Sequence, residues 1–287
     1  MIEELENKYV NLLIDRCLSF KNGKSLFINY FDDNEKFVEK LVTKAKSKGI
    51  DDIYLDRHNK EERHQKLLQS VEEIKNDDYF DASIWDEYVK KDAAFLMLST
   101  EFPGYFADIP SENMTAASLK TRTSKPLYKL KQLTNEISWC IAVIPNKIWA
   151  KEKFPDLSED DVYNEYFKLM CHCTMVDREN PIEEWDNFLD RQRSLVRALN
   201  DLQITKMHYT NSLGTDLVIG LSPDALWQCA GYEGSDVIVN MPTYEVFTSP
   251  DYRLTEGIVY ASKPLMYGGA LVDKFWVKFK DGKVIDY

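Results

Sequence analysis

The sequence lacks a long apolar run. Nowhere in its 287 residues do about 18 apolar residues follow one another, which is the length that a membrane-spanning helix needs. Residues 1–6 are rich in glutamate, whereas a secretory signal starts with basic residues and continues with an apolar stretch. We therefore expect a cytoplasmic protein without a membrane partner.

Positive charge is also scarce. The chain has 36 Lys and Arg against 48 Asp and Glu, so its formal net charge is −12. Binding to a phosphate backbone requires a basic face that releases counterions. The composition therefore argues against a nucleic-acid partner.

Cysteines are few and irregularly spaced. There are five of them, an odd number, so a disulfide framework of the secreted type is not expected. We expect reduced thiols at all five positions, which are Cys17, Cys140, Cys171, Cys173 and Cys229.

The remaining composition is that of an ordered globular protein. Hydrophobic residues make up 44% and charged residues 29%, and 287 residues are enough for two domains. Strand-length apolar runs alternate with amphipathic stretches of helical length through the first two thirds of the chain. This alternation is typical of an α/β fold with a parallel sheet.

Four apolar runs predict the strands of that sheet. They cover residues 26–30, 53–55, 93–98 and 139–144, and an amphipathic helix is expected between the first two, ending at Gly49. A charged stretch at 59–75 predicts another helix. We assign residues 1–205 to this N-terminal α/β domain.

Two later helices have clear start signals. Ser158 with Asp161 resembles a capping box, and Asn180 precedes Pro181 at a first helical position. Each stretch then carries apolar residues along one face. We expect both helices inside the first domain.

After residue 205 the helical periodicity disappears. Short β-type segments at 206–210, 216–221, 236–240, 256–261 and 271–286 are separated by turn residues. The pair Asp281-Gly282 between two alternating runs predicts a hairpin. We expect residues 206–287 to be the β-rich first part of a second, α+β domain, and we expect the chain to be truncated.

The most specific string is Asn240-Met241-Pro242-Thr243-Tyr244-Glu245-Val246-Phe247-Thr248-Ser249-Pro250-Asp251. It resembles the signature Asn-x-Pro-Thr-Glu-Glu-Val-Phe-Thr-x-Pro-Asp of the thermophilic metallo-aminopeptidases, the aminopeptidase T and aminopeptidase S type. Only Tyr244 departs from it, because the family usually has the first of two glutamates there.

The resemblance extends over essentially the whole chain. The strand Gly214-Thr215-Asp216-Leu217 is similar to a Gly-Thr-Asp-Leu strand of the family, and the run from Trp139 through Pro145 to Ala150 is similar to a Trp-Cys…Pro…Trp-Ala segment. The opening, from Tyr9 to Gly49, also resembles the start of family members.

Membership would imply an exopeptidase that removes N-terminal residues from peptides with two divalent metal ions (Zn, Co, Mn or Mg). The second glutamate of the signature is a metal ligand in the family, and it corresponds to Glu245. Paired ions need anionic oxygen ligands, and they activate a bridging water. The resemblance also implies a homodimer.

The other ligands of the family are a second glutamate, two histidines and an aspartate, which lie with an active-site tyrosine in downstream motifs that this sequence does not contain. None of the four histidines, His58, His64, His172 and His208, lies in a matching segment. We therefore expect a metal-dependent aminopeptidase that is inactive as this fragment, and no catalytic residue is assigned.

Two other functions stay open. One is a non-catalytic binding or scaffold protein that keeps the aminopeptidase fold without its metal site. The other is an α/β enzyme that binds a small molecule at the strand ends. A nucleotide-binding fingerprint would then follow Tyr30, but residues 31–34, Phe-Asp-Asp-Asn, contain none.

Further candidates have simpler interpretations. Cys171 and Cys173 on one predicted helix would point away from each other, which disfavours a zinc site. His58 and His64 lie in a charged stretch that predicts a solvated helix face or loop. Asp216 and Asp251 are candidates for residues that orient a metal ligand or form a turn, and we assign catalysis to neither.

Overall fold

The computed structural model describes residues 2–21, 23–267 and 270–287. The chain divides into two compact units. Unit 1 comprises residues 1–186 and 234–243, and unit 2 comprises residues 187–233 and 244–287. The division falls earlier than the boundary expected near residue 205, inside a long helix, and the domain boundary at 205 stays a prediction.

Unit 1 is built on a five-stranded parallel sheet. Its order is β2-β1-β3-β4-β8, so the predicted parallel α/β fold is confirmed. The strands are β1 (Ser25–Phe31), β2 (Asp52–His58), β3 (Ala94–Ser99), β4 (Trp139–Val143) and β8 (Asn240–Met241).

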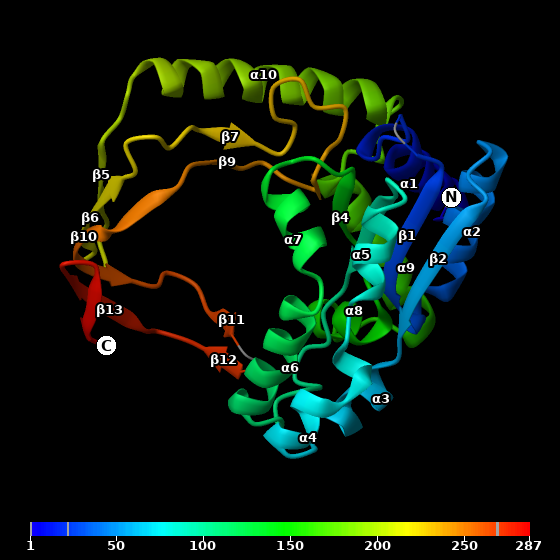
Figure 1. Ribbon diagram of the computed structural model, residues 1–287, viewed down its shortest axis with the longest axis horizontal. Helices are drawn as coiled ribbons and strands as arrows, with labels where there is room; N and C mark the ends of the chain where they lie inside the picture. The colour runs from blue at the N-terminus through cyan, green and yellow to red at the C-terminus, as the bar shows by residue number, and fades with distance from the viewer. Residues whose placement is uncertain (1, 22, 268–269) are drawn as a thin grey trace. The chain divides into compact units, whose positions relative to one another are not determined.

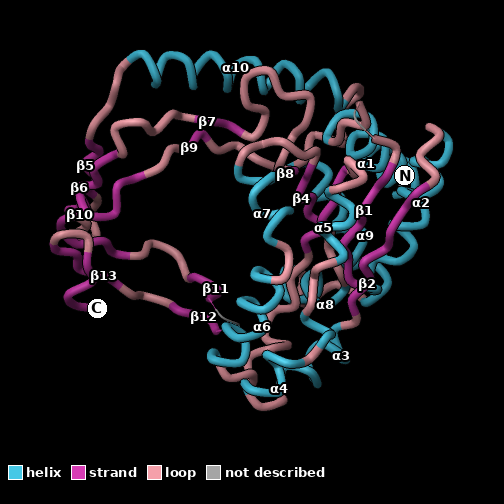
Figure 2. Tube along the Cα trace, viewed as in Figure 1, coloured by secondary structure: helices cyan, strands magenta, loops and turns pink. Residues whose placement is uncertain are grey.

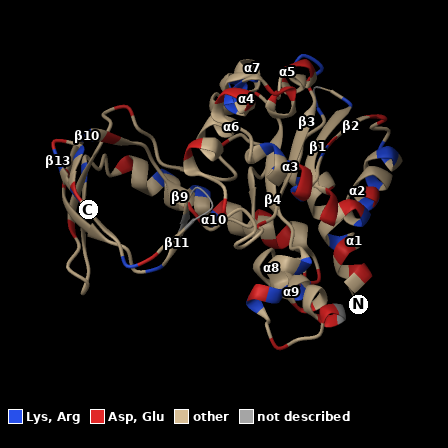
Figure 3. Cartoon of the chain, turned by 90° about the horizontal axis from the view of Figure 1, so that it is seen from below, with Lys and Arg blue, Asp and Glu red and all other residues tan. Residues whose placement is uncertain are grey.

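Helices cover both faces of this sheet. Figure 3 shows α4 to α7 above it and α1, α2, α8 and α9 below it. The α-helices, including α10, which leads into unit 2, are α1 (Ile2–Leu12), α2 (Glu35–Ser47), α3 (Lys60–Leu67), α4 (Val71–Asn76), α5 (Ile84–Val89), α6 (Ser111–Thr123), α7 (Pro126–Leu133), α8 (Lys147–Lys153), α9 (Glu159–Cys173) and α10 (Pro181–Asp201). Shorter helical turns are η1 (Leu13–Cys17), η2 (Asp32–Asn34) and η3 (Asp78–Phe80).

Alternation along the strands divides the core between the two faces. Phe27 and Phe95 pack with Trp85 and Tyr128 of the upper helices. Because successive side chains point to opposite faces, the fully buried Leu26, Ile28 and Leu96 face the lower helices. The result is a three-layer α/β unit with a closely packed aromatic cluster on one face.

Local capping explains several helix starts. Ser158 caps α9 by accepting a hydrogen bond from the Asp161 amide, and α10 begins at Pro181, both as predicted. The stretch at 59–75 is not one helix but two, α3 and α4. Ser70 and Glu73 form a complete capping box between them, which starts a new helix there.

Segment 236–240 does not belong to the β-rich part of the chain. It leads into β8, whose residues Asn240 and Met241 pair in parallel with Ile141 and Ala142 of β4. Figure 2 shows β8 beside β4. The sheet of unit 1 is therefore completed by a segment that returns from a distant part of the sequence.

Unit 2 contains a five-stranded antiparallel sheet in the order β14-β13-β10-β6-β5, visible in Figure 1. Its strands are β5 (Lys206–Thr210), β6 (Asp216–Leu221), β10 (Pro250–Tyr260), β13 (Trp276–Lys280) and β14 (Lys283–Asp286). Two further pairs join β7 (Gln228–Cys229) to β9 (Val246–Phe247), and β11 (Leu265–Tyr267) to β12 (Ala270–Val272). The hairpin at Asp281-Gly282 is confirmed, since both residues have positive φ and join β13 to β14.

Candidate metal-ligand segment

The segment that carries Glu245 runs from one unit into the other. β8 ends at Met241, a cis peptide bond joins Met241 to Pro242, and unit 2 resumes at Tyr244. Glu245 then directly precedes β9, whose Val246 pairs with Cys229 of β7. The carboxylate is thus attached to backbone that a strand pair fixes on its C-terminal side.

The residue before Glu245 is held against α10 within unit 2. The Tyr244 ring packs edge-on against the Phe188 ring, with 5.3 Å between ring centroids. The Tyr244 carbonyl accepts a hydrogen bond of 3.5 Å from the Gln192 side chain. The tyrosine that departs from the family signature therefore serves as a packing residue here.

The Glu245 side chain is exposed. A carboxylate buried in an apolar core would have been unable to take a metal ion without a large desolvation cost. The exposure of Glu245 leaves it accessible to a divalent cation, although its role as a ligand stays a proposal.

The described residues do not complete a metal site around it. Within residues 2–21, 23–267 and 270–287, no three His, Cys, Asp or Glu side chains are grouped so that they would hold a metal ion. A pair of divalent ions needs several anionic ligands to offset their mutual repulsion. Glu245 alone does not fit that requirement, so no reaction step is assigned to a metal ion here.

Cys171 and Cys173 lie near the end of α9 with different environments. Cys171 is buried and Cys173 is exposed, as expected for thiols two residues apart on a helix. Burial raises the pKa of the Cys171 thiol to about 12, so it stays protonated and is a poor metal ligand at neutral pH. None of the five cysteines, all of which lie in the described part of the chain, forms a disulfide bond, in agreement with the expectation of reduced thiols.

The interpretation of His58 and His64 as residues of a solvated helix face or loop was wrong for His58. His58 is the last residue of β2, and its Nε2 lies 2.8 Å from the Asn29 side-chain nitrogen and 3.5 Å from an oxygen of Asp56. His64 is on α3 and pairs with Asp108 at 2.9 Å. The reason is that β2 ends in the polar residues Asp56, Arg57 and His58, which resemble the charged sequence of the helix α3 that follows.

Asp216 and Asp251, the candidates for orienting a metal ligand, each contact a nearby basic side chain. Asp251 accepts two hydrogen bonds from Arg253, at 2.8 and 2.6 Å, and these hold the pKa of Asp251 below its usual range. Asp216 lies 2.7 Å from His208 across β5 and β6. Both contacts are at the surface of unit 2, and neither includes Glu245.

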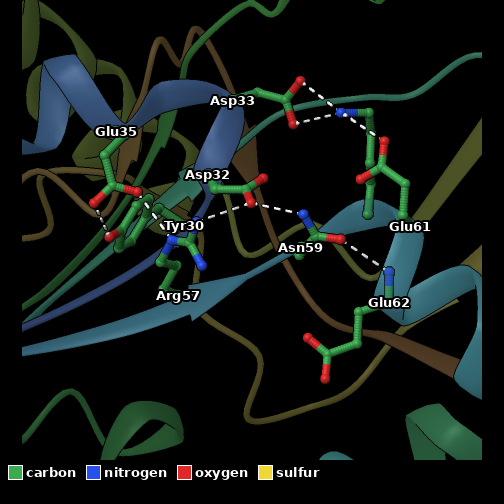
Figure 4. A network of polar contacts seen from close by, with 9 residues as sticks. Tyr30, Asp32, Asp33, Glu35, Arg57, Asn59, Glu61 and Glu62 are labelled. Carbon is green, nitrogen blue, oxygen red and sulfur yellow. Dashed lines mark hydrogen bonds and ion pairs between the residues drawn. The ribbon is translucent and has the colours of Figure 1, made fainter.

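A network of hydrogen bonds and ion pairs lies at the carboxyl ends of β1 and β2 (Figure 4). Asp32 accepts hydrogen bonds from Arg57, at 3.1 Å, and from the Asn59 side chain, at 2.7 Å. Glu35 accepts from Arg57 at 2.9 Å and from the Tyr30 hydroxyl at 3.1 Å. These charge pairs occupy the position where a nucleotide-binding fold would have a glycine-rich turn.

No helix in the described part of the chain combines the length and the apolar character needed to cross a bilayer. In Figure 3 the positions of acidic and basic residues are interspersed along α2.

Comparison with known proteins gives this fold a class. The chain is similar over 100% of its length to the solved structure of wild-type AmpT from Thermus thermophilus, with a TM-score of 0.83 and 26% identity, and covers 71% of that chain. Over its whole length the chain therefore has the fold of AmpT.

Curated relatives agree with this class. The chain is 30% identical to aminopeptidase PepS of Streptococcus thermophilus, over 99% of its own length and 70% of that protein. It is 28% identical to aminopeptidase AmpS of Bacillus subtilis, over 98% and 69%. For aminopeptidase T of Thermus aquaticus the identity is 27%, over 97% and 62%.

The profile of the thermophilic metalloprotease (M29) family matches residues 2–287, and the chain belongs to this family. The resemblance noted in the motif from Asn240 to Asp251 is thereby confirmed. The expectation of a truncated chain stays a prediction.

Proposed function

We propose that the protein is a metal-dependent aminopeptidase that removes N-terminal residues from peptides. Glu245 is one ligand of its pair of divalent ions. The observation that supports this most directly is the family match across residues 2–287, which includes the signature segment around Glu245. The exposed position of Glu245 beside a fixed strand pair agrees with a ligand role.

The proposal includes the inactivity of the 287-residue chain by itself. One carboxylate does not hold two cations against their repulsion, and the described residues offer no group of three ligands. We expect this chain alone to show no hydrolysis of a leucyl chromogenic substrate above background, with Zn²⁺, Co²⁺, Mn²⁺ or Mg²⁺ added. Hydrolysis that a chelator abolishes would contradict the inactivity but support the peptidase assignment.

Titration calorimetry with Zn²⁺, Co²⁺ and Mn²⁺ tests Glu245 itself. We expect weak binding that Glu245→Gln removes, because the amide keeps the shape but loses the charge. Glu233→Gln is the matched control, since Glu233 is an exposed glutamate of unit 2 whose partner is Arg197, at 2.9 Å. Equal metal binding by the wild type and by Glu245→Gln would contradict the assignment of Glu245 as a metal ligand.

The second candidate function is a non-catalytic binding or scaffold protein with the aminopeptidase fold. The missing ligand group among the described residues favours it. It predicts no metal binding by the wild-type chain at all. In the first proposal the partners are a peptide with a free N-terminus and a second copy of the chain, and the location is the cytoplasm.

A further inference from the structure

Unit 1 contains a cavity of about 550 Å³ that plays no part in the proposed peptidase chemistry. All its lining residues lie between Asn29 and Ile141, so the cavity belongs to unit 1 alone. The strands contribute Asn29, Asp56, His58 and Met97, each from the carboxyl-terminal half of its strand. Open parallel sheets commonly bind small ligands at this end.

The strands change character along the face that lines the cavity. Phe27, Tyr54 and Phe95 pack into the aromatic cluster. Two residues further on, the same face carries Asn29, Asp56 and Met97, because side chains alternate with a period of two. Polar side chains on the covered face of a parallel sheet cost stability, so their placement there points to a binding role.

The Asp56 carboxylate has its hydrogen-bond partners within the protein. It accepts hydrogen bonds from the Asn29 side chain, at 2.8 Å, and from the Trp85 indole, at 3.2 Å. Burial by itself would raise the pKa of Asp56, but contacts with His58, Asn29 and Trp85 outweigh burial and lower it. The carboxylate therefore stays ionised and fixed in the cavity wall.

In contrast to Asp56, the cationic side chains of the cavity have no partner of opposite charge among the described residues. Within the described part of the chain, Arg63, Arg122 and Lys125 form no ion pair with a carboxylate. The Lys125 ammonium instead lies 3.4 Å from the centre of the Trp85 ring and 5.1 Å from that of Tyr128. A cation–π contact holds the ammonium in position without neutralising its charge.

Arg63 lies deeper than Arg122. It is half-buried, and burial lowers the pKa of its guanidinium, which shows that the group is poorly solvated. Near it, the Tyr79 hydroxyl is buried and contacts the Arg63 guanidinium, but it has no acceptor for its own proton within the described structure. A half-buried cation without an anionic partner and a buried hydroxyl without an acceptor are both costly, and one bound anion would satisfy both.

The charge balance of the cavity opposes that of the whole chain. Four cations, Arg63, Arg122, Lys125 and Lys129, stand against two carboxylates, Asp56 and Asp81, whereas the chain carries −12. The other walls are apolar and include Phe31, Ile84 and Ile141. A ligand that matches both features combines an anionic group with an apolar body.

We propose that this cavity binds a small organic anion, a carboxylate or phosphate ester with an apolar body, whose charged group lies between Arg63, Arg122 and Lys125. A planar guanidinium binds two oxygens of either group at once. None of the residues that line the cavity belongs to the segment from Asn240 to Asp251. The cavity would give unit 1 a ligand-binding role of its own.

Calorimetric titration of the intact chain at low salt with phenyl phosphate and with benzoate tests this site, with benzyl alcohol as the neutral probe. We expect saturable binding of at least one anion and none of the alcohol. Arg122→Gln and Lys125→Met should each weaken binding about tenfold, since each removes one charge-assisted contact. Lys120→Gln is the matched control on α6, because Lys120 bonds the Lys75 carbonyl and does not line the cavity.

A variant that is expected to bind the anion more tightly shows that changes in affinity are not caused by disruption of the fold. Asp81→Asn removes a carboxylate from the cavity but keeps the oxygen that accepts the Ser83 amide. We expect it to strengthen anion binding about two- to threefold. Absence of binding by both anions up to millimolar concentration would overturn the proposal, and so would binding that none of the cavity variants alters.

Discussion

Lys125 is a single residue in an environment unfavourable to its charge. Burial, and to a lesser extent the neighbouring Lys129, lower the pKa of Lys125 from 10.5 to about 8, although Asp56 and Asp86 attract the ammonium at longer range. The folded protein therefore binds this proton less tightly than the unfolded chain does. The resulting cost to stability is complete below about pH 8 and is relieved as the pH rises toward 10.5.

We predict that Lys125→Met stabilises the protein near neutral pH, by an amount on the order of 1 kcal/mol after allowance for solvent screening and for the lost cation–π contact. Methionine keeps most of the apolar stem. The advantage should shrink as the pH rises from about 8 toward 10.5, because the wild-type lysine then loses its proton in the folded state. Denaturant unfolding of both proteins across this range measures the difference, and a difference independent of pH would contradict the assignment.

Single residues differ in how far the sequence predicts them. Glu245 is proposed as a ligand from its motif, because a continuous string of residues specifies its position. His58, Asp56 and Lys125 come from three separate segments, and their meeting depends on strand order and helix packing. Asn29, Asp56 and His58 carry a weak signal, since each is a polar residue in the carboxyl-terminal half of a predicted strand or shortly after it.

At the scale of elements, β10 depends on close contact with its neighbour. Gly257 has φ +109° and pairs with Leu217 of β6. A Cβ at this position would lie 2.0 Å from the Asp216 carbonyl oxygen, which belongs to the backbone and has little freedom to move. Only glycine allows the two strands to approach in this way.

We predict that Gly257→Ala lowers the free energy of unfolding of unit 2 by about 3 kcal/mol or more, because backbone overlap adds to the strain of a positive φ. Gly214→Ala is the control in the same unit. Gly214 has φ +102°, but its Cβ would meet only the Tyr260 ring, at 3.3 Å, so a loss of about 1 kcal/mol is expected there. Hydrogen exchange in β6 and β10 measures the effect, and equal losses in the two variants would refute it.

Most elements of unit 1 follow from local signals. The strands at 26–30, 93–98 and 139–144 are apolar runs bounded by breakers, and the caps at Ser158 and Asn180 mark helix starts. β8 has no such signal. It is only two residues long, and its position depends on a parallel partner, β4, that lies far away in the sequence.

At the scale of the whole molecule, the two units differ in how much apolar surface they bury. Fully buried apolar residues are frequent in unit 1, on both faces of its sheet. Among the described residues of unit 2, the buried apolar ones are Leu189, Leu217, Leu221, Cys229 and Ala230, whereas Leu226, Leu271 and Tyr252 are 62–72% exposed. A sequence pattern shows which residues are apolar but not how many of them a partner covers, so this contrast was not predictable.

We predict that unit 2 unfolds before unit 1 in denaturant, in a separate transition. Each Å² of apolar surface removed from water contributes about 25 cal/mol to stability. In the unit with the smaller buried core, this contribution exceeds the conformational-entropy cost of folding by less, so that unit unfolds at a lower denaturant concentration. Hydrogen exchange followed by mass spectrometry should show peptides from β10 exchanging at denaturant concentrations where peptides from β3 remain protected. Leu217→Ala should shift only the first transition, and Leu96→Ala, which removes a fully buried side chain of β3, only the second. A single transition shifted by both variants would show that the two units fold as one.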